Sequence, residues 1–201
     1  MSFEVQAHRA NDELTLRRLL AASPSSVEVD VGLADAGLVV AHDVDHGDAS
    51  GLALDAALAI AGETRLVVEA KCFPPSTPSP RAFARALRPY LCRVALCSFD
   101  ERVLLEARRL QAGIDTTFLF ERPVRPATSA LTIGPRRDLV SAGLVEGAHA
   151  LGLRVVPWTV DDPREMAALV ELGVDGLVTG EPALAWSVRA SLRGERRHAF
   201  A

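Results

Sequence analysis

The feature of this sequence that most constrains its fold is a regular alternation between short apolar runs and longer segments with helical spacing. The short runs are rich in valine, leucine and isoleucine, as strands buried in a parallel sheet are. Strands that alternate with helices of about 10–15 residues form βαβ units and hence parallel sheets. We expect eight such strands: Phe3–Ala7, Ser26–Val31 with Leu38–Ala41, Arg65–Ala70, Val94–Ser98, Thr116–Phe120, Ala130–Ile133, Arg154–Val160 and Gly176–Thr179.

Segments with helical spacing separate most of these strands, and several have recognisable ends. Some begin at a proline, whose missing N–H costs nothing in the first helical turn, and several end at a glycine, where a left-handed cap fits. The predicted helices are Glu13–Ala22, Leu52–Ala61, Pro80–Leu91, Glu101–Ala112, Arg137–Leu151, Pro163–Leu172 and Pro182–Leu192. The segment Glu121–Ser129 has no helical period and is too short for a full helix.

The arithmetic of these units points to one architecture. Eight units in 201 residues leave about 25 residues for each, which is near the lower size limit of a (β/α)8 barrel. We therefore expect residues 1–201 to form a single compact (β/α)8 barrel with some helices short or missing. A doubly wound open sheet is the alternative, but it would need a glycine-rich phosphate turn after its first strand. That strand is followed instead by His8-Arg9-Ala10.

Composition excludes several classes of function. A net charge of −4 provides no basic footprint for nucleic acid, and no apolar run approaches the roughly 20 residues of a membrane span. Because Met1–Ala10 has no signal-peptide profile, we expect a cytoplasmic protein. The cysteines Cys72, Cys92 and Cys97 form no CxxC pair, and we expect each to be a reduced, buried side chain. Nothing in the sequence indicates an oligomeric state.

Carboxylates gather where the second and third strands end, which is the catalytic end of a barrel. Glu28 and Asp30 are two residues apart on one strand, so they share a face while the intervening valines take the other. Glu69 and Lys71 are related in the same way on the next strand. Three carboxylates in one barrel mouth would repel each other unless a cation joined them. Their oxygens favour a hard divalent ion, Mg²⁺ or Ca²⁺.

Two histidines flank this cluster and are candidates for proton transfer. His8 lies at the end of the first strand and His42 follows the second; for each, the alternative is a hydrogen-bonded structural histidine. Asp43 either orients His42 or is a turn residue. Pro74–Pro80 is either a stiff connector or the edge of a lid. The remaining histidines lack such neighbours and are expected to be structural or solvated: His46, His149 and His198.

Lys71 is the only lysine among 22 basic residues. In a composition that otherwise uses arginine, its retention indicates a place where a compact ammonium is needed rather than a planar guanidinium. The alternative is a surface lysine retained by chance.

The order of these motifs resembles that of the glycerophosphodiester phosphodiesterases. The resemblance covers essentially the whole chain and rests on these residues: His8-Arg9, Val27-Glu28-Val29-Asp30-Val31, Val39-Val40-Ala41-His42-Asp43, Val68-Glu69-Ala70-Lys71, Ser98-Phe99-Asp100, Val156-Pro157-Trp158-Thr159-Val160 and Gly173–Thr179. It implies a (β/α)8 barrel that uses a divalent metal to hydrolyse glycerophosphodiesters to glycerol 3-phosphate and an alcohol. It also implies three groups of site residues: the metal ligands Glu28, Asp30 and Glu69, the acid–base pair His8 and His42, and Arg9, Lys71 and Trp158 for phosphate and substrate.

The sequence departs from the family pattern at four places. Ala10 replaces the usual glycine, Glu13-Leu14-Thr15 compresses the usual Glu-Asn-Thr segment, Val44–Ser50 shortens the insertion that shapes the cleft, and Gly180 replaces an acidic residue. The chemistry is therefore better supported than the substrate. Two alternatives to hydrolysis remain: transfer or cyclisation of a specialised phosphoester at the same site, and a non-catalytic barrel that only binds.

Overall fold

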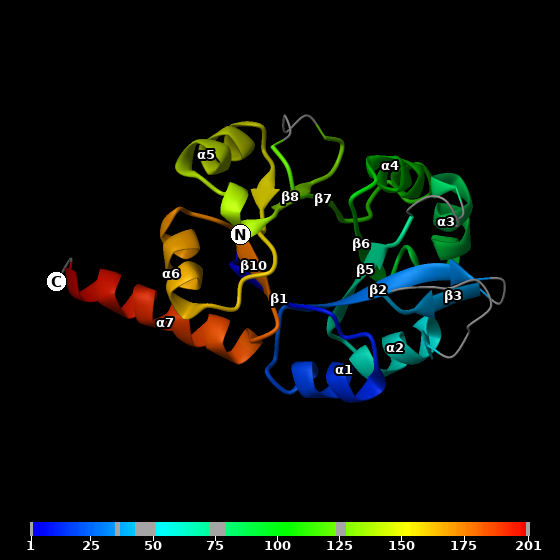
Figure 1. The fold of residues 1–201 in the computed structure, drawn as a ribbon, viewed down its shortest axis with the longest axis horizontal. Helices are drawn as coiled ribbons and strands as arrows, with labels where there is room; N and C mark the ends of the chain where they lie inside the picture. The colour runs from blue at the N-terminus through cyan, green and yellow to red at the C-terminus, as the bar shows by residue number, and fades with distance from the viewer. Residues whose placement is uncertain (1, 35–36, 43–50, 73–78, 124–127, 200–201) are drawn as a thin grey trace.

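The computed structural model describes residues 2–34, 37–42, 51–72, 79–123 and 128–199. Its centre is a ring of parallel strands with the helices outside it (Figure 1). These strands pair in the order β10-β1-β2-β5-β6-β7-β8-β9, which confirms the predicted barrel. Their bounds are β1 (Glu4–Ala7), β2 (Ser26–Ala34), β5 (Arg65–Ala70), β6 (Val94–Ser98), β7 (Thr116–Phe120), β8 (Thr132–Pro135), β9 (Arg154–Val155) and β10 (Gly176–Thr179).

The ring is completed between β9 and β10 by individual hydrogen bonds rather than by a continuous ladder. Asp175 N donates to Val155 O at 2.8 Å, Val178 N donates to Pro157 O at 2.9 Å, and Val160 N donates to Val178 O at 2.9 Å. The strand predicted over 154–160 is therefore wrong in length, since β9 ends at Val155. Hydrogen bonds to β8 continue beyond Val155, since Val156 N donates to Ile133 O at 3.0 Å and Trp158 N donates to Pro135 O at 3.1 Å. On the side that faces β10, however, Pro157 has no N–H to donate to a ladder.

A small antiparallel extension departs from β2. β3 (Gly37–Val40) pairs with the end of β2, and β4 (Leu52–Ala53) pairs with β3. After β3, Ala41 N donates to Asp30 O at 3.0 Å. This bond returns the chain to the barrel mouth and brings His42 to the strand that carries Asp30.

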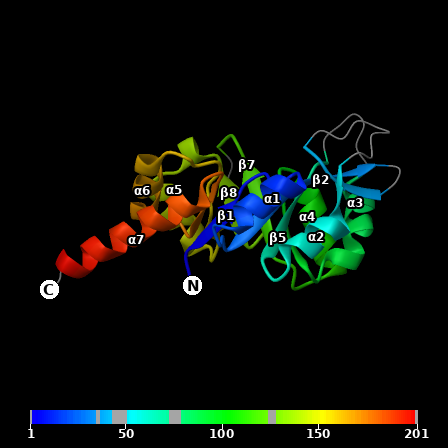
Figure 2. The same ribbon diagram turned by 90° about the horizontal axis from the view of Figure 1, so that it is seen from below.

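Seven α-helices lie in the described residues, most of them close to their predicted positions. Their bounds are α1 (Glu13–Leu20), α2 (Leu54–Ala61), α3 (Pro80–Leu87), α4 (Glu101–Leu110), α5 (Ala142–Ala150), α6 (Pro163–Glu171) and α7 (Pro182–Ala199), with short 3₁₀ helices η1 (Arg88–Tyr90) and η2 (Arg137–Leu139). The last helix, α7, extends away from the barrel toward the C-terminus (Figures 1 and 2). Within the described part of the chain, none of the helices combines the length and apolarity needed to cross a membrane.

Two helix starts differ from prediction for local reasons. The helix predicted from Arg137 begins at Ala142, because the Ser141 side chain accepts from Leu144 N and caps it there. The helix predicted from residue 52 begins at Leu54, because Leu52 and Ala53 pair with β3 instead. Between β7 and β8 the described residues contain no helix, as the aperiodic sequence predicts.

The barrel strands separate two apolar regions. Outward side chains such as Val27, Val29 and Val31 are fully buried against the helices, as the alternation on β2 predicts. A smaller cluster inside the barrel contains Cys97 and Leu119, with Trp158 packed on it. Polar side chains on the same strands therefore face the barrel interior.

Candidate active site

A cavity of about 310 Å³ lies at the carboxyl ends of the strands. All eight residues predicted for the site line it: His8, Arg9, Glu28, Asp30, His42, Glu69, Lys71 and Trp158. They come from β2 and β5 and from the segments that follow β1, β3, β5 and β9. The structure thus brings together residues that are dispersed over most of the chain.

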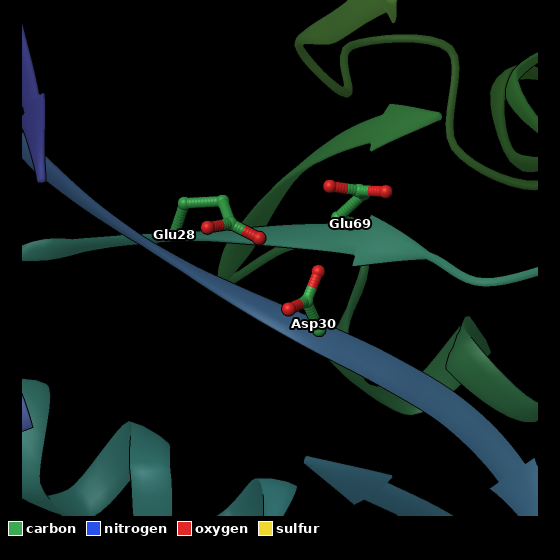
Figure 3. Close-up of side chains that lie close together, drawn as sticks. All are labelled: Glu28, Asp30 and Glu69. Carbon is green, nitrogen blue, oxygen red and sulfur yellow. The ribbon is translucent and has the colours of Figure 1, made fainter. Parts of the chain in front are cut away.

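The three carboxylates converge in the barrel interior (Figure 3). In the parallel register Asp30 is paired with Glu69, and Glu28 lies two residues earlier on β2. Ligand atoms of the three residues lie within 4.8 Å of one another. All three are buried, with exposed fractions of 2% for Glu28, 1% for Asp30 and 6% for Glu69. The convergence expected from the spacing is confirmed.

The electrostatics of this cluster favour a bound cation. Glu28 Oε1 is buried with no hydrogen-bond partner, which is costly for a carboxylate that is ionised. Burial raises the pKa of Glu28 well above its usual value, and the charges of Asp30 and Glu69 raise it further. Burial also raises the pKa of Glu69. Because all the available ligand atoms are carboxylate oxygens, the residues present fit Mg²⁺ or Ca²⁺.

Lys71 lies inside the cavity rather than at the surface. Its side chain is 13% exposed, and Nζ lies 2.7 Å from Asp30 Oδ1 and 2.5 Å from Glu69 Oε1. Burial alone would lower the pKa of Lys71, but the two carboxylates outweigh burial and raise it. Burial would likewise raise the pKa of Asp30, yet hydrogen bonds from Lys71 and Asn11 lower it. The ammonium therefore compensates two of the three carboxylates.

The two histidines reach the cavity from different segments. His8 Nε2 lies 4.0 Å from Glu28 Oε2, and His8 Nδ1 lies 3.3 Å from Thr159 Oγ1. Burial lowers the pKa of His8 despite the opposing charge of Asp30, which favours a neutral imidazole at pH 7. His42 follows β3 and lines the same cavity while remaining exposed to solvent. A pair of imidazoles beside buried carboxylates can accept and donate protons in turn.

Arg9 and Trp158 complete the predicted set. Arg9 has a left-handed backbone (φ +67°), and its Nε lies 3.5 Å from Asp30 Oδ2 while the side chain remains half exposed. Trp158 Nε1 donates to Gly134 O at 2.7 Å, and its ring meets Phe99 edge to face at 5.3 Å between centroids. The cavity thus has a charged wall and an apolar wall.

Sequence reasoning missed two polar residues that hold the site. Asn11 Nδ2 donates to Asp30 Oδ2 at 2.6 Å, and Thr159 contacts His8. Asn11 lies only two residues after Arg9, which was a usable signal. Thr159 follows the motif tryptophan directly, but its partner is 151 residues away.

Other residues singled out in the sequence lie elsewhere. His149 pairs with Asp175 at 2.9 Å outside the cavity, as a structural histidine would. Cys72 and Cys97 are buried as expected, but Cys92 is exposed, so the prediction for Cys92 was wrong. Cys92 lies outside the strands, in the segment that follows η1. Predictions for the following fall outside the described residues or side chains: Asp43, His46, Val44–Ser50, His198 and most of Pro74–Pro80.

Solved structures with the same fold cover nearly the whole chain. A glycerophosphodiester phosphodiesterase from Parabacteroides distasonis superimposes with a TM-score of 0.79 at 20% identity, covering 96% of this chain and 100% of that chain. A phosphodiesterase from Oleispira antarctica, in complex with the product sn-glycerol-3-phosphate, gives 0.80 at 17% identity, covering 93% and 96%. At these identities the likeness establishes the barrel fold.

Sequence comparisons identify the family. A curated glycerophosphodiester phosphodiesterase of Caldanaerobacter subterraneus subsp. tengcongensis is 29% identical over 96 residues, which cover 45% of this chain and 40% of that relative. The glycerophosphoryl diester phosphodiesterase family model matches residues 81–184, just over half of the chain. That segment contains Trp158 and Thr159, whereas the carboxylates and the histidines precede it. Because this family model matches more than half of the chain, the chain belongs to the glycerophosphoryl diester phosphodiesterase family.

Proposed function

We propose that this protein is a metal-dependent phosphodiesterase that hydrolyses a glycerophosphodiester to glycerol 3-phosphate and an alcohol. The observation that carries the proposal is the cavity in which three buried carboxylates, one with an unpartnered oxygen, lie beside two histidines. Family membership and the curated relative of that name support the substrate class. The Oleispira antarctica structure, which holds sn-glycerol-3-phosphate, supports the product.

Glu28, Asp30 and Glu69 would hold the divalent cation. When bound, the cation would neutralise charge on the phosphodiester oxygens, which favours attack at phosphorus. Arg9 would bind a second phosphate oxygen with its exposed guanidinium. Lys71, whose ammonium lies in the same cavity between Asp30 and Glu69, would contact the same phosphate.

His8 and His42 would transfer the protons. The lowered pKa of His8 favours a neutral imidazole that accepts the proton of the attacking hydroxyl, which belongs either to the substrate or to water. His42 would then donate a proton to the leaving alcohol oxygen. Attack by a neighbouring hydroxyl of the substrate would pass through a cyclic phosphate, whereas attack by water would give the linear product directly. Trp158 and Phe99 would cover the apolar side of the substrate.

A panel of glycerophosphodiesters with different alcohols, assayed with and without a chelator, tests the proposal. We expect release of glycerol 3-phosphate that stops with chelator and returns with Mg²⁺ or Ca²⁺. A stable cyclic or transferred phosphoester would instead indicate the alternative reaction at the same site. Binding without turnover of any substrate, in the presence of metal, would contradict the proposed activity and indicate a binding barrel.

A further inference from the structure

The segment that follows β1, residues Arg9–Asn11, contacts both carboxylates of β2. Arg9 N donates to Glu28 Oε2 at 2.8 Å, and Asn11 Nδ2 donates to Asp30 Oδ2 at 2.6 Å. Asn11 Oδ1 in turn accepts from Asp30 N at 2.9 Å. Because the Asn11 amide donates to the side chain of Asp30 and accepts from its backbone, both ends of the amide are fixed by the same residue.

These bonds divide the oxygens of each carboxylate into two kinds. Asp30 Oδ2 is bound by Asn11, whereas Asp30 Oδ1 lies 2.7 Å from the Lys71 ammonium that also contacts Glu69. Figure 3 shows one Asp30 oxygen directed toward the space between the three carboxylates and the other directed away. On Glu28 the oxygen bound by Arg9 is Oε2, and Oε1 has no partner. Each carboxylate of β2 therefore has one oxygen held by the Arg9–Asn11 segment and one that faces the other charged groups of the cavity: Glu28 Oε1 without a partner, and Asp30 Oδ1 beside the Lys71 ammonium.

We propose that Asn11 holds Asp30 as a ligand through a single oxygen and thereby biases the site toward Mg²⁺ over Ca²⁺; this inference rests on the proposed metal-dependent function. Ca²⁺ takes about 6–8 oxygens in flexible geometry and often binds both oxygens of a carboxylate, whereas Mg²⁺ requires near-octahedral geometry and shorter bonds. Because the Asn11 bond directs Oδ2 away from the space between the carboxylates, turning the carboxylate so that both oxygens face one ion would distort or break that bond.

The position of Asn11 suits this role in a shortened chain. The segment between Arg9 and the first residue of α1 is only three residues long. One of those residues, Asp12, caps α1 by accepting from Thr15 N at 2.8 Å. Asn11 therefore contacts the metal-site carboxylate while its neighbour holds the helix. In this loop, Asn11 positions a metal ligand, whereas Asp12 has only a structural role.

Titration calorimetry of metal-free protein with MgCl₂ and with CaCl₂ at matched ionic strength tests the inference. Loss of a partner that hydrogen-bonds a metal ligand typically weakens metal binding by about 10–100-fold. In Asn11→Ala we expect Mg²⁺ affinity to fall by about tenfold and Ca²⁺ affinity by less than about threefold, so that the preference shifts toward Ca²⁺. Asn11→Ser provides the same comparison if the alanine variant does not fold. The control Asp12→Ala should lower stability and leave the ratio of the two affinities unchanged.

The possible failures are distinct. Equal losses of Mg²⁺ and Ca²⁺ affinity in both Asn11 variants, or a wild-type protein that prefers Ca²⁺, would overturn the selectivity inference and leave the proposed function intact. Absence of binding of either ion to the wild-type protein would overturn both. A shift in the ratio in Asp12→Ala equal to that in Asn11→Ala would also overturn the inference, because it would assign the effect to the loop as a whole.

Discussion

Thr159 and His8 are 151 residues apart in sequence, and Thr159 Oγ1 lies 3.3 Å from His8 Nδ1 at the mouth of the barrel. The contact joins the segment after β9 to the end of β1. It leaves His8 Nε2 as the ring nitrogen that lies toward Glu28. The Thr159 hydroxyl therefore fixes which ring nitrogen of His8 is turned toward the carboxylate cluster.

Thr159→Val tests the effect of this contact on turnover. Valine keeps the shape of threonine and removes the hydroxyl, and a single hydrogen bond contributes about 0.5–1.5 kcal/mol. We expect kcat to fall by about three- to tenfold with KM little changed. Thr159→Ser should restore most of the rate, and Thr117→Val, near the start of β7, should have no effect. Nitrogen chemical shifts of His8 should show a changed tautomer in Thr159→Val; an unchanged tautomer and rate would contradict the positioning role.

The two histidines give the most direct test of the acid–base mechanism. His8→Ala and His42→Ala should each reduce turnover by on the order of 10²–10⁴-fold, the usual contribution of a positioned acid or base. Circular dichroism should show that both variants remain folded. His149→Ala is the control, because His149 pairs with Asp175 outside the cavity. Near-normal turnover in both His8→Ala and His42→Ala on a substrate that the wild-type protein cleaves would refute the mechanism.

Much of this site could be predicted because strand periodicity determines which residues share a face. Glu28 and Asp30, and then Glu69, needed only the alternation along β2 and β5 and the parallel pairing of neighbouring strands. The same reasoning could not identify Asn11, because its contact with Asp30 depends on the path of the loop after β1. The path of such a loop depends on tertiary packing, and no periodic pattern in the sequence predicts it.

The errors in the fold have local causes that were visible in the sequence. Within the strand predicted over 154–160, Pro157 has no N–H to donate toward β10, and Ser141 starts a helix that the apolar pattern alone placed earlier. In both cases the hydrophobic pattern in the sequence is longer than the strand or helix that forms. The backbone requirements of proline and of a helix cap set the actual limits.

Lys71 affects stability as well as activity. The sequence alone predicts a loss of activity in Lys71→Arg with little change in stability, but the ammonium contacts two buried carboxylates. Removing one partner of a buried ion pair typically costs about 3–5 kcal/mol. We therefore expect Lys71→Met to lower the free energy of unfolding by about 3 kcal/mol in the presence of chelator, and added metal to restore part of it.

Turnover of Lys71→Arg separates the need for a compact ammonium from the need for a charge. A guanidinium is larger and planar, so it should not fit between Asp30 and Glu69. We expect Lys71→Arg to lose nearly as much activity as Lys71→Met. Kinetics of Lys71→Arg that equal those of the wild-type protein would show that any cation suffices.

Glu28 predicts how the stability of the metal-free protein depends on pH. Burial, with the nearby charges of Asp30 and Glu69, raises the pKa of Glu28 well above its usual value of about 4.3. A carboxyl group whose pKa is raised by folding stabilises the fold while it is protonated. That contribution is complete below the unfolded pKa and is lost as the pH rises through the folded pKa.

Urea denaturation of wild type and Glu28→Gln in chelator, from pH 5 to pH 8, measures this contribution. Glutamine at this position stays neutral, so the free energy of unfolding of Glu28→Gln should fall less over this range than that of the wild-type protein. Glu13→Gln, on the exposed surface of α1, should follow the wild-type curve. Parallel curves for the wild-type protein and Glu28→Gln would show that the buried carboxyl does not titrate in this range. Added Mg²⁺ should remove the excess pH dependence of the wild-type protein, because a bound cation compensates the ionised carboxylate that burial otherwise penalises.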